Sequence, residues 1–335
     1  MILQKFPIDF QWPVQEPFLF CVHHKDEYPA GQANFGPESK LLKGRNMGND
    51  FEARDGFRMY HGNPVPGFPV HPHRGFETIT VVRRGYVDHA DSMGAAGRYG
   101  EGDVQWMTAG AGVQHSEMFP LLKKDQNNPA ELFQIWLNLP KRSKMAAPHF
   151  TMFWSEKIPR VDSKDGKCSV SLIAGNFAEA KPLAPPPSSW AADSENEVTI
   201  LLVKMNAGGQ FELPASSRKT ARTLYFFEGE ELSLGGELLP THSGFVLDSK
   251  HDLKLSAASD GVEFLILQAR PIGEPVVQHG PFVMNSRDEI MQTIRDYQRT
   301  EFGGWSWPRP DMIHGPVIER FAKYPDGRID KPEVG

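Results

Sequence analysis

The stretch HPHRGFETIT, residues 71–80, places two histidines around a proline at the start of a β-type segment. In a strand, side chains at i and i+2 point to the same face, so His71 and His73 project together and Pro72 points away. A second pair with this spacing, His115 and Glu117, lies in AGAGVQHSEMF, residues 109–119. On neighbouring strands facing one interior, the two pairs supply three imidazoles and one carboxylate. That is a full set of side-chain ligands for a divalent transition metal.

The alternative interpretation is that His71 and His73 lie in a surface loop and bind no metal. A single His-x-His in a proline-rich loop is more often a surface feature than a ligand pair. The second pair, which follows a turn-forming Gly-Ala-Gly, favours the metal site. Spacing alone leaves Glu77 as a competitor of Glu117, since Glu77 shares the parity of His71 and His73; the i, i+2 relation to His115 favours Glu117. The adjacent His23 and His24 point apart on a strand. The remaining histidines are isolated, and we expect most to be exposed or satisfied locally: His61, His89, His149, His242, His251, His279 and His314.

Composition limits the classes of protein. The chain has 335 residues, a net charge of −6, 31 Gly and 28 Pro, which fits a turn-rich globular protein with a sizeable core. The mild negative charge argues against direct nucleic-acid binding. With only Cys21 and Cys168, no disulfide framework can form. The N-terminus does not have the pattern of a signal peptide, and no apolar run is long enough for a membrane span, so we expect a cytoplasmic protein.

Short runs rich in Val, Ile, Phe and Thr predict an all-β chain with little helix. The predicted strands lie in residues 77–90, 102–110, 132–139, 198–205 and 262–269, with a connector at about 140–168. We expect an N-terminal domain at 1–150, a second β domain at 165–275 and a C-terminal segment at 276–335. The second domain has no His-x-His or His-x-Glu pair, and we expect no metal there. Residues 286–302 predict a helix that starts at Ser286 or Asn285 and buries Ile290, Ile294 and Tyr297.

Several motifs together closely resemble the pirin family of two-domain cupins. They are the glycine-flanked His-x-His motif (67–85), GDVQWMTAGAGVQHSEM (102–118), FQIWLNL (133–139) and EPVVQHGPFVMNSRDEI (274–290). The resemblance implies two antiparallel β-barrels, with the C-terminal helix and tail packing back on the first. It also implies an iron site made by His71, His73, His115 and Glu117. Glu77, the carboxylate ligand of many other cupins, then has a buried supporting role.

The resemblance further implies a quercetin 2,3-dioxygenase-type activity on a flavonol or similar aromatic hydroxyl substrate, with O₂. Glu117 is the expected catalytic residue, receiving the substrate proton. Fe(II) is the expected metal, although the ligand types also suit Mn, Ni, Cu or Zn. Phe76, Trp106 and Phe133 are candidates for an apolar pocket wall or for plain barrel core.

The alternative implied by the family is a redox-sensing regulatory protein without enzymatic activity, which binds a protein partner as a transcription cofactor. The chain also departs from the common pirin pattern. It has additional N-terminal sequence, including FRMYHGNPVPGFP at 57–69, and additional sequence after residue 300. These departures leave the substrate and partners open.

Overall fold

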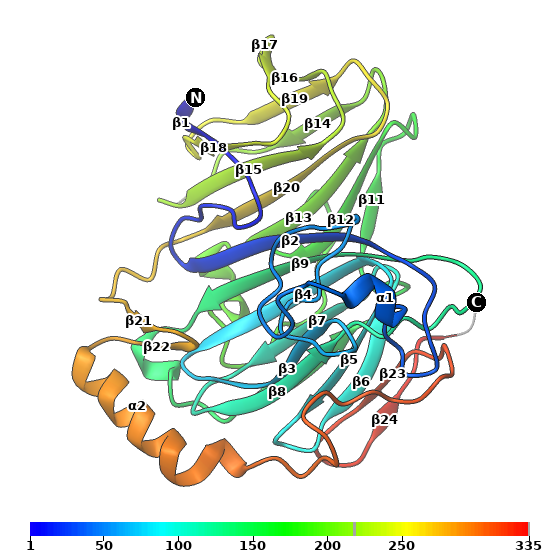
Figure 1. Ribbon diagram of the computed structural model, residues 1–335. Coiled ribbons are helices and arrows are strands. Elements are labelled where there is room, and N and C mark those ends of the chain that lie inside the picture. The colour runs from blue at the N-terminus through cyan, green and yellow to red at the C-terminus, as the bar shows by residue number, and fades with distance from the viewer. Residues whose placement is uncertain (217–218, 334–335) are drawn as a thin grey trace. The chain divides into compact units, whose positions relative to one another are not determined.

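The computed structural model describes residues 1–216 and 219–333 (Figure 1). The chain divides into two compact units, neither contiguous in sequence. The histidine unit comprises His23–Gln134, Lys141–Ser155 and Glu274–Gly335, and the apolar-core unit comprises Met1–Val22, Ile135–Pro140 and Glu156–Gly273. The predicted domain boundaries at 1–150, 165–275 and 276–335 stay a prediction.

A six-stranded sheet of the histidine unit carries both predicted ligand pairs. Its order is β24-β23-β6-β5-β8-β3. The strands are β3 (Gly67–His73), β5 (Tyr86–Asp91), β6 (Ala96–Gly100), β8 (Val113–Met118), β23 (Phe321–Lys323) and β24 (Ile329–Asp330). Strand β3 pairs antiparallel with β8, and β8 also pairs with β5. The segments that hold the two pairs, 42 residues apart from His73 to His115, therefore become direct neighbours.

A five-stranded sheet, in the order β10-β7-β4-β9-β2, accounts for the other strands around the site. They are β2 (Phe18–Tyr28), β4 (Phe76–Arg84), β7 (Val104–Thr108), β9 (Asn128–Asn138) and β10 (His149–Phe153). Strand β4 is built from FETITVVRR, whose β-branched residues suit a buried strand. Strands β2 and β9 contribute residues to both units.

The apolar-core unit consists mainly of a seven-stranded and a four-stranded sheet, ordered β1-β18-β15-β20-β13-β12-β11 and β14-β19-β16-β17. The first contains β1 (Ile2–Pro7), β11 (Arg160–Asp162), β12 (Cys168–Ala174), β13 (Thr199–Met205), β15 (Ala221–Glu228), β18 (Ser243–Leu247) and β20 (Val262–Ala269). The second contains β14 (Gln210–Leu213), β16 (Leu232–Leu234), β17 (Glu237–Leu239) and β19 (Leu253–Ala257). Alternate residues of these strands form one aliphatic and aromatic core, which includes Leu201, Val203, Leu224, Phe226 and Phe264.

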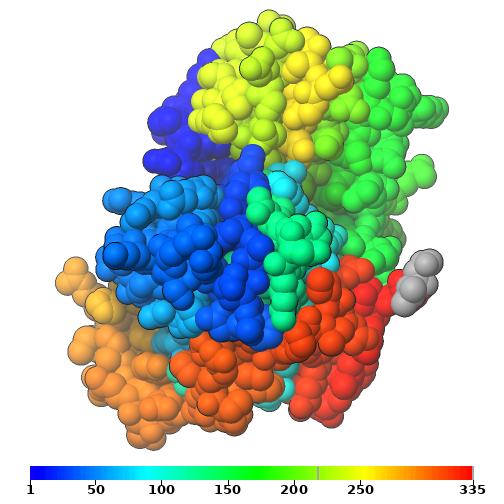
Figure 2. Space-filling model, turned by 45° about the vertical axis from the view of Figure 1, so that its right-hand side comes forward, coloured from blue at the N-terminus to red at the C-terminus, as the bar shows by residue number. Residues whose placement is uncertain are grey.

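The C-terminal segment belongs to the histidine unit. A hairpin of β21 (Val277–His279) and β22 (Phe282–Met284) precedes helix α2 (Arg287–Thr300), drawn in orange in Figure 1. Ser286 caps the helix by accepting a hydrogen bond from the Glu289 amide, as predicted. The predicted apolar stripe is also confirmed, since Ile290, Ile294 and Tyr297 pack in one cluster. The tail then pairs β23 with β6 and covers part of the unit's surface, orange to red in Figure 2.

The remaining helical elements are short. They are helix α1 (Ser39–Leu42) and the 3-10 turns η1 (Lys141–Ser143), η2 (Trp190–Ala192), η3 (Ser194–Asn196) and η4 (Glu301–Gly303). The mostly-β class, the antiparallel sheets and the C-terminal helix are confirmed. Closure of the sheets into barrels stays a prediction.

The predicted connector at 140–168 is more ordered than expected. It contains β10, which pairs with β7, and β11, which pairs with β12. Strands of five and three residues leave too short an alternation to recognise beside flanking Pro, Lys and Asp. No helix among the described residues has the length and apolar character needed to cross a bilayer.

Candidate metal centre

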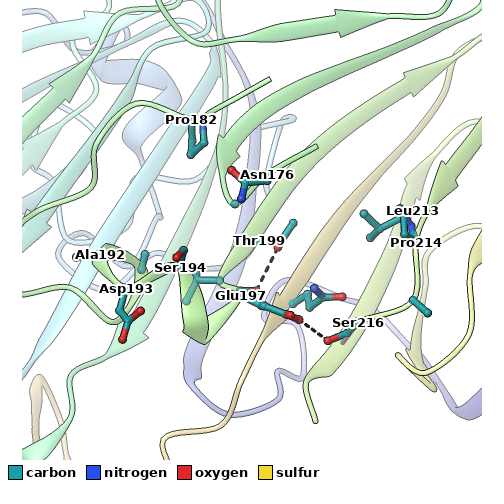
Figure 3. Close-up of a pocket in the computed structure, with 15 residues that line it drawn as sticks. Asn176, Pro182, Ala192, Asp193, Ser194, Glu197, Thr199, Leu213, Pro214 and Ser216 are labelled. Atoms are coloured by element: carbon teal, nitrogen blue, oxygen red, sulfur yellow. Dashed lines mark hydrogen bonds between the residues drawn. The ribbon is translucent and has the colours of Figure 1, made fainter. Parts of the chain in front are cut away.

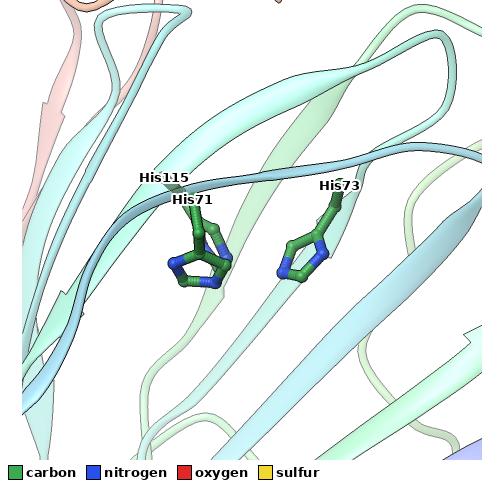
Figure 4. Close-up of side chains that lie close together, drawn as sticks. All are labelled: His71, His73 and His115. Atoms are coloured by element: carbon green, nitrogen blue, oxygen red, sulfur yellow. The ribbon is translucent and has the colours of Figure 1, made fainter. Parts of the chain in front are cut away.

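Three histidines converge from strands β3 and β8. His71 lies directly opposite His115 in the antiparallel register, and His73 is two residues further along β3. One ring nitrogen from each of His71, His73 and His115 lies within 4.8 Å of the others. The three ring centroids lie 4.5–4.9 Å apart. Figure 4 shows the three imidazoles side by side. Small rotations of the rings would bring the three nitrogens to one cation at ordinary metal–nitrogen distances of about 2.0–2.1 Å.

Burial keeps these imidazoles neutral, which is the form that binds metal. Loss of solvation lowers the pKa of His71 to about 4 and lowers the pKa values of His73 and His115 well below the ordinary value of 6.5. The backbone oxygen of Pro69 lies 2.8 Å from His71 Nδ1. If the Nδ1–H group donates a hydrogen bond to this oxygen, Nε2 is the ring nitrogen whose lone pair is free to bind a cation.

The environment of His115 indicates that the cluster fits a metal. Its side chain is fully buried, and neither ring nitrogen has a hydrogen-bond partner among the described residues. A buried polar nitrogen without a partner costs free energy, and a coordinated cation removes that cost. The donor set of three neutral imidazoles suits a divalent transition metal better than Mg²⁺ or Ca²⁺, which prefer oxygen ligands.

Glu117, the predicted fourth ligand, lies beside the three histidines but not within the group that they form. Its Oε2 atom is 3.8 Å from His115 Nε2. Thr80 Oγ1 lies 2.9 Å from Glu117 Oε1, and Gln134 Nε2 donates to Glu117 Oε2 at 2.8 Å. Burial raises the pKa of Glu117, an effect that nearby His89 and these hydrogen bonds oppose. The side chain is therefore held in place, and the ligand role of Glu117 stays a prediction.

Glu77, the competing carboxylate, lies outside the three-histidine group. It is the second residue of strand β4, is fully buried, and accepts a hydrogen bond of 2.6 Å from Thr108 Oγ1 on β7. The parity argument does not extend from His73 to Glu77, because β3 ends at His73 and the chain turns at Gly75, where φ is +86°. The hydrogen bond between Glu77 and Thr108 connects strand β4 to strand β7.

The turn after the second histidine is held by the C-terminal segment. A side chain at Gly75 would lie 2.0 Å from the Val283 carbonyl oxygen, so only glycine fits this approach. Arg74 donates to the Ala111 carbonyl at 2.7 Å and pairs with Asp296 of helix α2 at 2.9 Å. These contacts explain why the motifs at 71–80 and 274–290 occur together: the later segment fixes the end of the strand that carries His71 and His73.

His89 is a functional candidate that sequence reasoning missed. The sequence interpretation placed it among the isolated histidines, but it is fully buried, and its ring centroid is 5.4 Å from that of His115. Its Nε2 atom lies 3.1 Å from Asp91 Oδ2. His89 and Asp91 have the same i, i+2 spacing as the two ligand pairs, and this signal could have identified them. Thr80 and Gln134 had no such signal, because they reach Glu117 from strands β4 and β9.

The three aromatic residues considered for a pocket wall, Phe76, Trp106 and Phe133, are all fully buried. Phe76 lies against His73, with ring centroids 5.0 Å apart. Trp106 packs on Phe153, with centroids 6.2 Å apart. Complete burial favours the core interpretation for all three.

The apolar-core unit has a cavity of a different kind. It has a volume of about 360 Å³ and is lined by small, polar and carboxylate residues, among them Asn176, Glu197, Thr199 and Ser216. Figure 3 shows the Thr199 hydroxyl and the Ser216 hydroxyl bonded to the backbone and side chain of Glu197. Among the residues that the structure describes, the lining contains no histidine and no cysteine. Glu197 accepts hydrogen bonds from two other lining residues, Thr199 and Ser216. The cavity therefore does not resemble the histidine cluster.

Two family models match this chain. The Pirin family model matches residues 16–137, and the Pirin C-terminal cupin domain model matches residues 200–303. A pirin-like protein from Caulobacter vibrioides is 39% identical over 236 residues, which is 70% of this chain and 80% of the relative. A pirin-like protein from Solanum lycopersicum is 37% identical over 235 residues, 69% of this chain and 75% of the relative. The crystal structure of quercetin 2,3-dioxygenase from Acinetobacter baumannii superposes with a TM-score of 0.71 at 26% identity, covering 90% of this chain and 98% of that chain.

Proposed function

This chain belongs to the pirin family, and from that premise we propose that it is a metal-dependent dioxygenase of the quercetin 2,3-dioxygenase type. The substrate class is a flavonol or a similar aromatic hydroxyl compound, with O₂ as co-substrate. The likeness to the Acinetobacter baumannii enzyme supports the reaction class. Fe(II) is the proposed metal, in a site made by His71, His73, His115 and Glu117.

The observation that carries this proposal is the neutral three-histidine cluster, in which His73 and His115 are buried and both ring nitrogens of His115 lack partners among the described residues. A cation bound there would act as a Lewis acid that lowers the pKa of a substrate hydroxyl. The protein's own residues then have two tasks: to orient the three imidazoles and to accept the proton that the hydroxyl loses.

Glu117 Oε1 is the proposed proton acceptor. The Thr80 hydroxyl lies 2.9 Å from this atom and 2.8 Å from Gln134 Oε1, but it carries one proton and donates to one of them at a time. When Glu117 is ionised, Thr80 donates to it and Gln134 Nε2 holds the other oxygen.

When Glu117 takes a proton, its new hydroxyl can donate to Thr80 Oγ1, and the Thr80 proton turns to Gln134 Oε1. Glu117, Thr80 and Gln134 therefore satisfy their hydrogen bonds in both protonation states of the carboxyl group. Burial, which raises the pKa of Glu117, brings the carboxyl closer to the range where it can gain and lose a proton near neutral pH.

Oxygen uptake with quercetin tests the proposal. Protein stripped of metal and reloaded with Fe(II) is expected to consume O₂ when quercetin is added, and stripped protein is not. His115→Ala is expected to lower both metal affinity and turnover by at least about 100-fold, more than loss of a supporting residue behind a ligand. His251→Ala, which removes an exposed histidine of the apolar-core unit, is the matched control.

Iron-loaded protein that binds metal at the cluster but consumes no O₂ would contradict the enzyme. The regulatory alternative, with a protein partner, and the cytoplasmic location both stay predictions.

A further inference from the structure

Residues 51–68, which precede the His-x-His motif, supply a cluster of rings beside His71. Phe68 connects this cluster to the metal site, because its ring centroid is 6.3 Å from that of His71. Tyr60 stacks on Phe68 at 5.1 Å with an interplanar angle of 27°. Phe51 and His61 complete the cluster, with centroids 6.4 Å and 5.7 Å from that of Phe68.

The base of this cluster is rigid. Tyr60 is fully buried, and its hydroxyl donates to Asp26. Asp26 also accepts a 2.9 Å hydrogen bond from the Arg58 amide and pairs with the Arg58 guanidinium at 3.2 Å. Because Tyr60 is held at both its ring and its hydroxyl, the plane of Phe68 stacked on it is fixed before any ligand arrives.

The outer part of the cluster is open. Phe51, Phe68 and His71 are partly exposed and His61 is exposed, whereas His73 and His115 are buried. Of the three histidines of the metal site, His71 is thus the most exposed, and the partly exposed ring of Phe68 lies next to it. A flat molecule that reaches the metal past His71 would meet a preformed aromatic surface.

We propose that Phe68, backed by Tyr60 and flanked by Phe51 and His61, forms a stacking platform that selects planar aromatic substrates over non-aromatic chelators of the same metal. This inference rests on the proposed function of the same site and names the residues that set its specificity. Aromatic pairs at centroid distances of about 4.5–7 Å add stabilisation beyond apolar burial. A substrate ring on Phe68 would extend the stack that Tyr60 begins.

Anaerobic binding titrations of iron-loaded protein test the platform. Quercetin is the planar probe, and acetylacetone is a chelator without a ring. Phe68→Leu keeps the apolar volume but removes the aromatic face, and we expect it to weaken quercetin binding by about 3- to 10-fold. It should leave acetylacetone binding and iron content unchanged.

Phe68→Trp is the rescue variant and should restore quercetin binding to near the wild-type value. Phe177→Leu is the matched control, because Phe177 is a partly exposed ring stacked on Phe211 in the apolar-core unit. It should change neither titration.

The platform is wrong if Phe68→Leu binds quercetin as tightly as wild type, or if acetylacetone binding falls by the same factor. Platform and proposed function fail in distinguishable ways. Binding that depends on Phe68 without O₂ uptake would retain the platform and contradict the dioxygenase. O₂ uptake with a quercetin affinity that Phe68→Leu leaves unchanged would retain the enzyme and overturn the platform, and wild-type protein that binds no quercetin would overturn both.

Discussion

The interior of the apolar-core unit is filled by aliphatic and aromatic side chains, whereas strands β3 and β8 of the histidine unit turn three imidazoles inward. Both units are antiparallel β structures with alternating inward and outward residues. In one, Leu224 and Phe226 on β15 occupy alternate inward positions. In the other, His71 and His73 do so on β3. The same backbone periodicity therefore serves packing in one unit and ligand convergence in the other.

The difference has an energetic consequence. Apolar side chains that point inward gain free energy by leaving water, so the apolar-core unit is stabilised by its interior. The buried imidazole of His115, whose ring nitrogens have no hydrogen-bond partner among the described residues, loses solvation and gains little from packing. The proposed metal would offset this cost, while the Thr80–Glu117–Gln134 hydrogen bonds and the contact of Gly75 with Val283 of the C-terminal segment hold the surrounding strands in place.

We expect the largest effects from one substitution in the interior of each unit, and we expect the two substitutions to change different properties. Phe226→Ala empties a fully buried core position and is expected to lower the free energy of unfolding by about 3–5 kcal/mol, with no change in metal per folded chain. His115→Ala is expected to do the reverse: metal binding is lost, and the stability of the metal-free protein is changed little or increased. Denaturant unfolding and elemental analysis of both variants check this. A metal-free protein strongly destabilised by His115→Ala would break the comparison.

Thr80→Val removes the hydroxyl beside Glu117 while keeping the side-chain shape. We expect metal affinity or turnover to fall by about 10- to 100-fold, because residues behind the ligands typically have effects of this size. Thr199→Val is the control in the apolar-core unit, where a buried threonine donates to the Glu197 carbonyl at 3.2 Å. Its expected cost is about 1 kcal/mol of stability with no effect on metal. If Thr80→Val and Thr199→Val changed metal affinity equally, the hydrogen bond of Thr80 to Glu117 would not support the metal site.

The smallest expected effect is a pH dependence that comes from the histidine unit. Burial lowers the pKa of His24 from 6.5 to about 3. The unfolded chain therefore binds a proton at His24 below pH 6.5 while the folded protein does not, so stability is lost as the pH falls from 6.5 toward 3. For His24 alone, the loss between pH 7 and pH 5.5 is about 1 kcal/mol.

His24→Gln in the metal-free protein should remove that part of the slope. His251→Gln, at an exposed position of the apolar-core unit, should leave the slope as in wild type. The difference between the denaturant midpoints at the two pH values measures this slope for each variant. Identical slopes for wild type and His24→Gln would show that His24 is not held neutral.

Much of this architecture follows from local patterns in the sequence. The i, i+2 spacing predicted that His71 projects with His73, and the β-rich runs predicted strands where β4, β13 and β20 lie. Helix α2 was predictable because Ser286 is a good N-cap and Ile290 begins a helical stripe. These features depend on residues close together in the chain.

The parts that could not be predicted depend on contacts between distant strands. Gln134 reaches Glu117 from β9, and His89 reaches His115 through the pairing of β5 with β8. The parity argument for Glu77 fails because the chain turns at Gly75 between two strands, which a count of residues does not show. Sequence patterns thus locate side chains on a strand, while register decides which of them meet.

Anomalous diffraction from crystals of protein purified without added metal tests the central claim most directly. We expect one transition-metal peak within coordination distance of His71, His73 and His115, with a Glu117 oxygen close to the same ion. We expect no such peak in the apolar-core unit. A map with no peak at the three histidines, or with its peak elsewhere, would contradict the proposed metal site.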